Sequence, residues 1–75
     1  MNLNEVKLNV NCIIKSINIE DEKTKIRLME LGIVEGGSII VKNKSSLKKT
    51  LLIIINSCCF TLKSNLAQDV KVNYA

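Results

Sequence analysis

The most constraining feature of this sequence is a short helical segment that runs directly into a glycine turn. Thr24, Leu28 and Leu31 follow the i, i+4, i+7 spacing of one helix face. Asp21 is placed to cap the amino end of this helix, and Gly32 is placed to end it in the left-handed conformation. A helix of about 11 residues is not stable alone in water, so its apolar face must pack on another element.

Strand signals surround this helix on both sides. β-branched residues dominate residues 11–19, and their imperfect alternation predicts a strand with a local irregularity. After the helix, Val34 to Gly37 predict a tight turn in which Gly36 takes the positive φ of a type II turn. The hairpin that follows is expected to surround a polar loop at residues 45–49. Strands are expected at residues 38–44, 50–56, 58–63 and 70–72.

These elements predict one mostly β domain over residues 1–75. The order β-α-β-β-β-β favours a small, mostly antiparallel barrel of about five strands with one short helix after the first strand, because short strands close on themselves to remove exposed edges. A chain of this length has too few residues for a second core. The longest uninterrupted apolar run covers residues 51–55, far below the roughly 18 residues of a membrane span. We therefore expect that the chain does not cross a bilayer.

The composition argues against an enzyme. The chain has no His and no Trp, and its only aromatic residues are Phe60 and Tyr74, so the usual acid-base side chain for neutral pH is missing. Asp21, Glu22 and the thiols are the remaining candidates, and no motif joins them. A solvated helix start and core thiols explain these residues better, and we expect no catalytic residue.

The cysteines do not predict a metal site. Cys12, Cys58 and Cys59 lack Cys-x-x-Cys spacing and have no His partner, whereas a structural zinc site needs four ligands. Because Cys58 and Cys59 are adjacent, an extended backbone directs their thiols to opposite faces. Their odd number fits a reducing, cytosolic compartment. From the residues alone we expect no metal ligand and no cofactor.

Positive charge is concentrated in the expected hairpin. Eleven Lys and Arg residues against seven Asp and Glu residues give a net charge of +4. A lysine patch can meet nucleic acid, an acidic membrane surface or an acidic protein, or it can keep the end of a sheet soluble. A nucleic-acid module is the main rival to a protein-binding module, although neither aromatic residue lies in the lysine segment to stack on bases. The four hairpin lysines are Lys42, Lys44, Lys48 and Lys49.

The residues from Arg27 to Gly36, together with the strand pattern after them, resemble the FeoA family of small bacterial ferrous iron transport proteins. The resemblance covers nearly the whole chain and includes the closing segment at residues 67–72. It implies an SH3-like barrel and a cytoplasmic protein, peripheral to the inner face of the cell membrane where it meets its partner. That partner is implied to be FeoB, the membrane iron permease with a cytoplasmic GTP-binding domain. The structural motif of the resemblance comprises Leu28, Leu31, Gly32 and Gly36.

The resemblance leaves several points open. A related barrel forms the C-terminal domain of some iron-dependent repressors, so the alternative is an SH3-like nucleic-acid-binding or regulatory module. Weak binding of ferrous iron, a transition metal, is implied by the resemblance only. Glu35 stands where the family usually has Pro, and Ser57 stands where it usually has Gly. The loop after Lys44 lacks the family's common Gly-Asp-Pro stretch.

An apolar surface on the hairpin is the most informative departure from the family pattern. If the alternate residues from Ile39 and Leu51 face the interior, Ile40, Leu52 and Ile54 must face outward, where family members tend to have charged residues. Both registers that keep the inward sets together place Ile40 opposite Leu52 or Ile54, so the three form one patch. We hypothesise that this patch docks on the permease or on a second copy; the alternative is that the helix covers it.

Contact with a protein partner is therefore the expected mechanism, in which a rigid barrel biases the assembly or GTP cycle of FeoB. Arg27 and Glu30 are expected on the exposed helix face, and the hairpin lysines are expected to steer the chain toward an acidic surface. An ion pair on the surface is the simpler explanation of Arg27. Nucleic acid is disfavoured as a partner. The expected contact residues are Arg27, Glu30, Ile40, Leu52, Ile54, Lys42, Lys44, Lys48 and Lys49.

Overall fold

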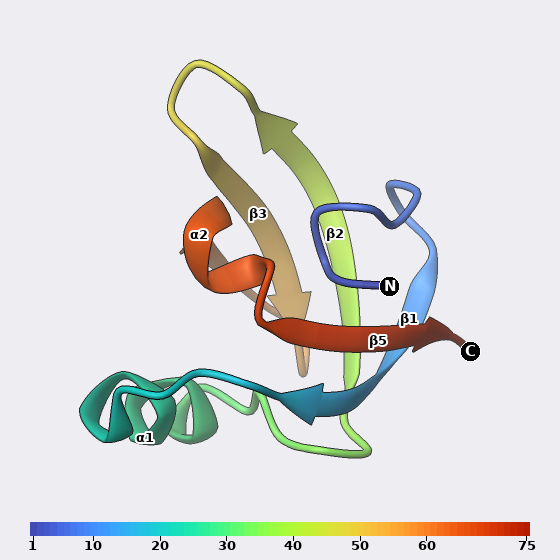
Figure 1. Ribbon diagram of the computed structural model, residues 1–75. Coiled ribbons are helices and arrows are strands. Elements are labelled where there is room, and N and C mark those ends of the chain that lie inside the picture. The colour runs from blue at the N-terminus through green and yellow to red at the C-terminus, as the bar shows by residue number, and fades with distance from the viewer.

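The computed structural model describes all residues 1–75 as five strands and two short helices. The strands form one antiparallel sheet in the order β4-β3-β2-β1-β5. Figure 1 shows β1 and β5 crossing in front of β2 and β3, so that the sheet curls over its own inner face. In chain order the elements are β1 (Asn11–Ile17), α1 (Glu22–Glu30), β2 (Ser38–Ser45), β3 (Thr50–Ile55), β4 (Cys58–Lys63), α2 (Ser64–Ala67) and β5 (Val70–Tyr74).

The curled sheet encloses a core that contains only apolar residues. Seventeen residues are buried, and none of them is polar or charged. On β3, Leu51, Ile53 and Ile55 alternate with less buried residues, as the period of two requires. The expected mostly β, SH3-like fold with antiparallel strands is confirmed, but the barrel is not closed, because no pairing joins the edge strands β4 and β5. The core comprises Leu3, Val6, Cys12, Ile14, Ile17, Ile19, Leu28, Ile33, Ile39, Val41, Leu51, Ile53, Ile55, Leu62, Ala67, Val70 and Val72.

Helix α1 begins and ends as the sequence indicates. Asp21 is its N-cap, and its carboxylate accepts hydrogen bonds from the backbone N–H and the hydroxyl of Thr24. At the other end Gly32 has φ of 103° and donates to the carbonyl of Met29 at 3.0 Å, while Ile33 donates to that of Leu28 at 2.9 Å. These two bonds make a Schellman motif, which satisfies carbonyls at the helix end.

The apolar face of α1 is narrower than its sequence pattern indicates. Leu28 is its only buried residue, and Thr24 is half-buried. Leu31, expected on the docked face, is 38% exposed because it lies at the C-cap. Ile33, placed by the Schellman turn, is fully buried instead. The helix is therefore anchored through Leu28 and the residues that follow it.

The turn after α1 has the predicted geometry. The N–H of Gly37 donates to the carbonyl of Val34 at 3.0 Å, and Gly36, the third residue of this turn, has φ of 83°. Gly36 also donates to the carbonyl of Ile14 at 2.8 Å. The turn is thus of type II, and it is tied to β1 before β2 begins.

Two bulges and a second helix complete the fold. The pairing of β1 with β5 shifts register between Ile14 and Ser16, which confirms the expected irregularity in the first strand. The pairing of β2 with β3 shifts between Val41 and Asn43, which the alternation did not predict. The four-residue helix α2, also not predicted, connects β4 to β5 and buries Ala67.

Candidate docking face

The outer face of β2, β3 and β4 presents three rows of residues across the sheet. Nearest the β3–β4 turn, Ile40 pairs with Ile54, which pairs with Cys59. The expected pairing of Ile40 with Ile54 or Leu52 is therefore realised with Ile54. The middle row is Asn43, Leu52 and Thr61, and the row nearest the β2–β3 loop is Ser45, Thr50 and Lys63. The face changes from apolar to polar and cationic along the hairpin.

Helix α1 does not cover this face. Leu52 is 39% exposed, and Ile40 and Ile54 are half-buried. The hollow beside Leu28 is lined by Ile53 and Leu62, whose side chains belong to the inner face of the sheet. The alternative in which the helix lies over the outward residues of the hairpin is therefore wrong, because α1 packs at the open side of the curled sheet.

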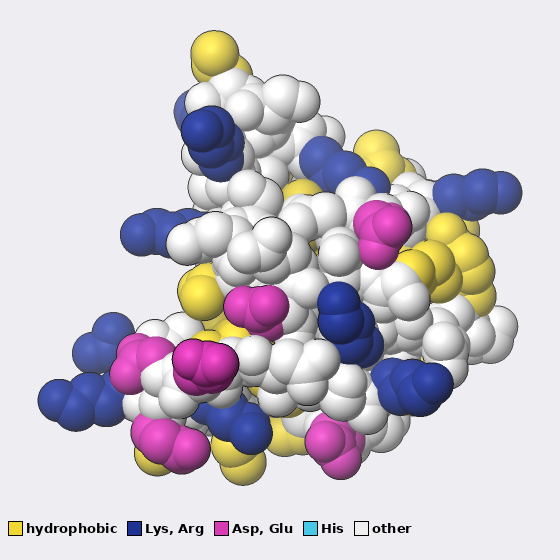
Figure 2. Space-filling view, in the orientation of Figure 1, with side chains coloured by type: hydrophobic (Ala, Val, Ile, Leu, Met, Phe, Trp, Pro, Cys, Tyr) yellow, Lys and Arg dark blue, Asp and Glu magenta, His cyan; other side chains and the backbone are white.

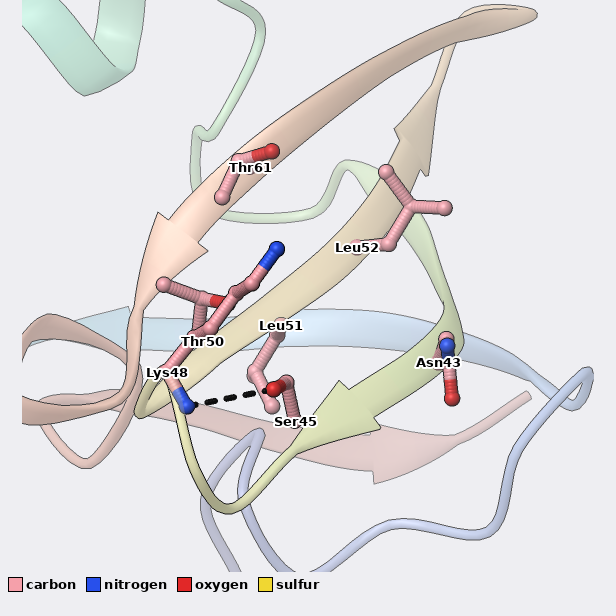
Figure 3. A pocket seen from close by; sticks show the side chains of 7 residues that line it. All are labelled: Asn43, Ser45, Lys48, Thr50, Leu51, Leu52 and Thr61. Carbon is pink, nitrogen blue, oxygen red and sulfur yellow. Dashed lines mark hydrogen bonds between the residues drawn. The ribbon is translucent and has the colours of Figure 1, made fainter.

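Figure 3 shows a shallow hollow at the polar end of this face. The side chain of Lys48 extends back along the hairpin toward Leu52 and Thr61. The backbone N–H of Lys48 donates to the hydroxyl of Ser45 at 3.2 Å, which holds the start of this side chain in place. A cation therefore borders the apolar residues. The residues around the hollow are Asn43, Ser45, Lys48, Thr50, Leu51, Leu52 and Thr61.

The hairpin lysines do not act as one group. Lys44 lies on the inner side, because the bulge at Lys42 reverses the alternation of β2 beyond it. Its ammonium donates to the carbonyl of Asn4 at 2.8 Å and to that of Val6 at 2.7 Å. Lys44 thus holds the N-terminal segment against the barrel, and we do not include it in the docking face. Lys42 is exposed at the bulge.

A lysine from another strand joins this surface. Lys63, at the end of β4, lines a hollow together with Lys48 and Lys49. The sequence does not reveal Lys63 as part of this surface, because its position depends on the pairing of β4 with β3, which places Lys63 opposite Thr50. No carboxylate lines this hollow.

The exposed surface of α1 includes the two helix residues that were expected to contact a partner, and it also includes exposed apolar side chains. Arg27 and Glu30 are exposed on the helix, and Arg27 lines the hollow beside Leu28 together with Thr61. Arg27 also lies close enough to Asp21 to help lower the pKa of that carboxyl group, after the larger effect of the hydrogen bond from the Thr24 hydroxyl. Ile26 is 51% exposed and Met29 is 49% exposed, which the helical spacing of the other apolar residues did not reveal.

The thiols and carboxylates do not form a metal centre. Cys12 is buried, its thiol donates to the carbonyl of Val10 at 3.5 Å, and burial raises its pKa. Cys58 and Cys59 are exposed. No three His, Cys, Asp or Glu side chains are grouped so that they could hold a metal ion. The donor set therefore does not fit a transition-metal site within one chain.

The sequence matches one protein-family model over nearly its whole length. The model of the FeoA domain matches residues 1–74. Comparison with curated protein sequences found no match. Neither α1 nor α2 has the length and apolar composition needed to span a membrane.

Solved structures of several other proteins share the fold. The solution structure of iron(II) transport protein A from Clostridium thermocellum matches with a TM-score of 0.87 and 23% identity, over 100% of this chain and 46% of that one. This chain thus spans about half of that relative. The zinc complex of Stenotrophomonas maltophilia FeoA matches with a TM-score of 0.79 and 28% identity, over 97% and 89% of the two chains. IdeR of T. acidophilum matches with a TM-score of 0.83 and 16% identity, over 100% and 34%.

These structures bear on the two roles that the sequence left open, an accessory protein of iron transport and a nucleic-acid-binding or regulatory module. The S. maltophilia protein is described as a prokaryotic SH3 domain protein and a candidate activating factor of ferrous iron transport. The likeness to part of IdeR, at 16% identity, shows a shared fold and carries no assignment of role. The family model covers nearly the entire sequence. In this chain helix α1 ends at Glu30, Gly32 follows it and the turn at Gly36 comes next, with the positive φ values expected for the two glycines. The chain belongs to the FeoA family.

Proposed function

We propose that this chain is a cytoplasmic accessory protein of bacterial ferrous iron uptake that binds the cytoplasmic GTP-binding part of a FeoB-type permease. Membership of the FeoA family supports the link to ferrous iron transport. The lack of a grouped donor set for a metal supports a role through protein contact rather than iron carriage by this chain. Docking would bias the assembly of the permease or its nucleotide cycle.

The observation that carries this proposal is the uncovered apolar row on the outer face of the hairpin. Ile40 pairs directly with Ile54, and Leu52 follows on the same face of β3. Because Ile40 and Ile54 are already half-buried, covering the rest of two such side chains at a partner contributes about 1 to 3 kcal/mol before the cost of association. Lys48 at the border of this row would favour approach to an acidic surface, which acts mainly on the association rate.

A pull-down of the full chain with the permease's cytoplasmic domain, with and without guanine nucleotide, tests the proposal. Leu52→Lys should reduce capture at least tenfold, because it places a charge next to the Ile40–Ile54 row on the same face of β3. Ile26→Lys is the matched control, since Ile26 is a similarly exposed apolar residue on α1. Equal capture of the wild-type chain and the Leu52→Lys chain, both folded, would refute this docking face.

A second copy of the chain is the other occupant to be tested on the same face. An isologous dimer would bring two Ile40–Ile54 rows together. Light scattering of the purified chain over a range of concentrations measures this directly. A dimer that Leu52→Lys dissociates would assign the face to self-association and would remove it from the permease.

A nucleic-acid module remains the second candidate function, favoured by one observation. Lys48, Lys49 and Lys63 line a common hollow without a carboxylate, which suits phosphate groups. The outer face offers no aromatic side chain for base stacking, since Phe60 packs against the core and Tyr74 lies on β5. A salt titration of binding to single-stranded RNA and to duplex DNA tests it; no affinity at low salt excludes it.

A further inference from the structure

The two ends of this molecule carry opposite charge. Residues 36–68 contain five lysines and no Asp or Glu, whereas residues 20–35 contain five Asp and Glu against two lysines and one arginine. The first range includes the β2–β3 hairpin and the second includes α1. Figure 1 shows the tip of the β2–β3 hairpin at one end of the molecule and α1 at the other. Figure 2 shows several Asp and Glu side chains around the helix and none at the tip. The fold therefore separates charge along its length.

The tip of the positive end carries an apolar residue. Leu47 is 95% exposed, more than any other large apolar side chain of the chain. It lies in the four-residue loop between β2 and β3. Figure 2 shows an apolar side chain at the apex of the projecting hairpin, with Lys or Arg side chains below it.

The loop that presents Leu47 is held by hydrogen bonds at both of its ends. On one side the N–H of Lys48 donates to the Ser45 hydroxyl at 3.2 Å. On the other side the N–H of Ser64, at the start of α2, donates to the carbonyl of Lys49 at 2.9 Å. Lys49 has φ of 54°, the left-handed conformation that reverses the chain into β3. The exposure of Leu47 is therefore a consequence of a formed turn.

Cations lie immediately behind this apolar apex. Lys48 and Lys49 from the loop and Lys63 from β4 line one hollow, together with the polar residues Thr50, Ser64 and Asn65. Lysine side chains can extend toward phosphate groups while their aliphatic carbons lie along a less polar surface. In an anionic membrane surface the phosphates lie outside the acyl chains. If the tip enters such a surface, the leading apolar residue reaches the acyl chains while the three lysines behind it lie level with the phosphates.

We propose that the β2–β3 tip binds an anionic lipid surface, with Leu47 entering the boundary of the acyl chains and Lys48, Lys49 and Lys63 contacting lipid phosphates. The acidic end that contains α1 would then point away from the membrane. Each lysine near such a surface strengthens binding about fivefold, so the tip gives weak, salt-sensitive, peripheral binding. The projection of the tip from the rest of the molecule (Figure 2) and its lack of an aromatic residue favour lipid over nucleic acid.

This proposal does not depend on binding to the permease. If both hold, attachment at the tip would keep the outer face of the hairpin close to a membrane protein and raise its local concentration there. Binding to lipid vesicles can be measured without the permease, so either proposal can fail without the other.

Sedimentation of the full chain with lipid vesicles tests the proposal. The chain should sediment with vesicles that contain phosphatidylglycerol and not with vesicles of pure phosphatidylcholine, and binding should weaken as salt rises above about 0.1 M. Lys48→Gln combined with Lys49→Asn should reduce binding about 25-fold, the product of two fivefold effects. Asn is chosen at position 49 because it tolerates the left-handed conformation. Leu47→Ser should reduce it severalfold.

Matched variants on α1 serve as controls. Ile26→Ser removes an exposed apolar side chain, and Lys23→Gln with Lys25→Gln removes two cations, all at the acidic end; these variants should bind vesicles as the wild type does. The proposal is overturned if the chain does not bind anionic vesicles at low salt, or if the variants of the tip and those of α1 lose binding equally. Tighter binding to a single-stranded oligonucleotide than to anionic vesicles, lost in the lysine variant, would assign the tip to nucleic acid instead.

Discussion

A methyl group placed at the Cβ position of Gly32 would lie 2.8 Å from Cγ2 of Ile55. Gly32 also has φ of 103°, which side chains of L residues rarely adopt. The C-terminal end of α1 thus packs tightly against the end of β3, where Ile55 is buried. Gly32→Ala should destabilise the protein by at least about 2 kcal/mol, the sum of backbone strain and overpacking. Urea denaturation measures this change.

Gly36→Ala separates the two causes. Gly36 has φ of 83°, but no atom lies within 4 Å of the position that its Cβ would occupy. Only the backbone strain remains, so we expect a loss of about 1 to 2 kcal/mol. Equal losses for the two variants would show that the approach of Gly32 to Ile55 is not a tight contact.

Much of the fold around Gly32 could be predicted from sequence because the signals are local. Helical spacing, the N-cap at Asp21 and the glycine at the helix end each depend on residues a few positions apart. The contact of Gly32 with Ile55 could not be predicted, because the two residues are far apart in the sequence and neither local pattern indicates that the two segments pack together. Helix α2 was missed because four residues are too few to show a helical period.

The candidate site was predictable only up to the bulge in β2. Strict alternation placed Ile40 opposite either Leu52 or Ile54, and the second of these pairings is the one observed. The same alternation would have placed Lys44 outward with Lys42. The bulge at Lys42 adds one residue to β2, so every side chain beyond it changes face. No glycine or proline marks this bulge in the sequence. Lys44 therefore changed from an expected contact residue to an internal one.

Replacement of Lys44 tests this structural role. Its ammonium donates to the carbonyls of Asn4 and Val6. In Lys44→Met both carbonyls lose their charged donor, and we expect a loss of about 1 to 3 kcal/mol in the free energy of unfolding. Lys42→Met is the control, because Lys42 is exposed at the bulge and its replacement should change stability by less than about 0.5 kcal/mol. If the two variants unfold at the same urea concentration, Lys44 does not hold the N-terminal segment.

The N-cap of α1 should contribute a stability that depends on pH. The hydrogen bond from the Thr24 hydroxyl lowers the pKa of Asp21 in the folded protein. Because the folded value lies below the unfolded one, the stabilisation is fully present above the usual range of aspartate, about pH 4, and is lost as pH falls through the lowered value. Thermal unfolding of the wild type and Asp21→Asn, compared at neutral and acidic pH, measures this contribution. The difference in Tm between them should shrink on acidification; a difference independent of pH would contradict the assignment.

The two-residue loop between β3 and β4 should be improved by glycine. Ile55 pairs with Cys58, so Asn56 and Ser57 form the turn, and their φ values are 51° and 67°. Asn tolerates this conformation, whereas Ser has no such preference. Ser57→Gly should therefore stabilise the protein by about 1 kcal/mol through relief of strain.

Ser38→Gly provides the opposite expectation for the same substitution. Ser38 lies in β2 without a positive φ, so glycine there should cost about 0.5 to 1 kcal/mol through greater freedom of the unfolded chain. Urea midpoints at an unchanged m value compare the two variants directly. A gain at position 57 together with a loss at position 38 would establish that the sign of the effect is set by local backbone conformation, because the change in side chain is identical in both cases.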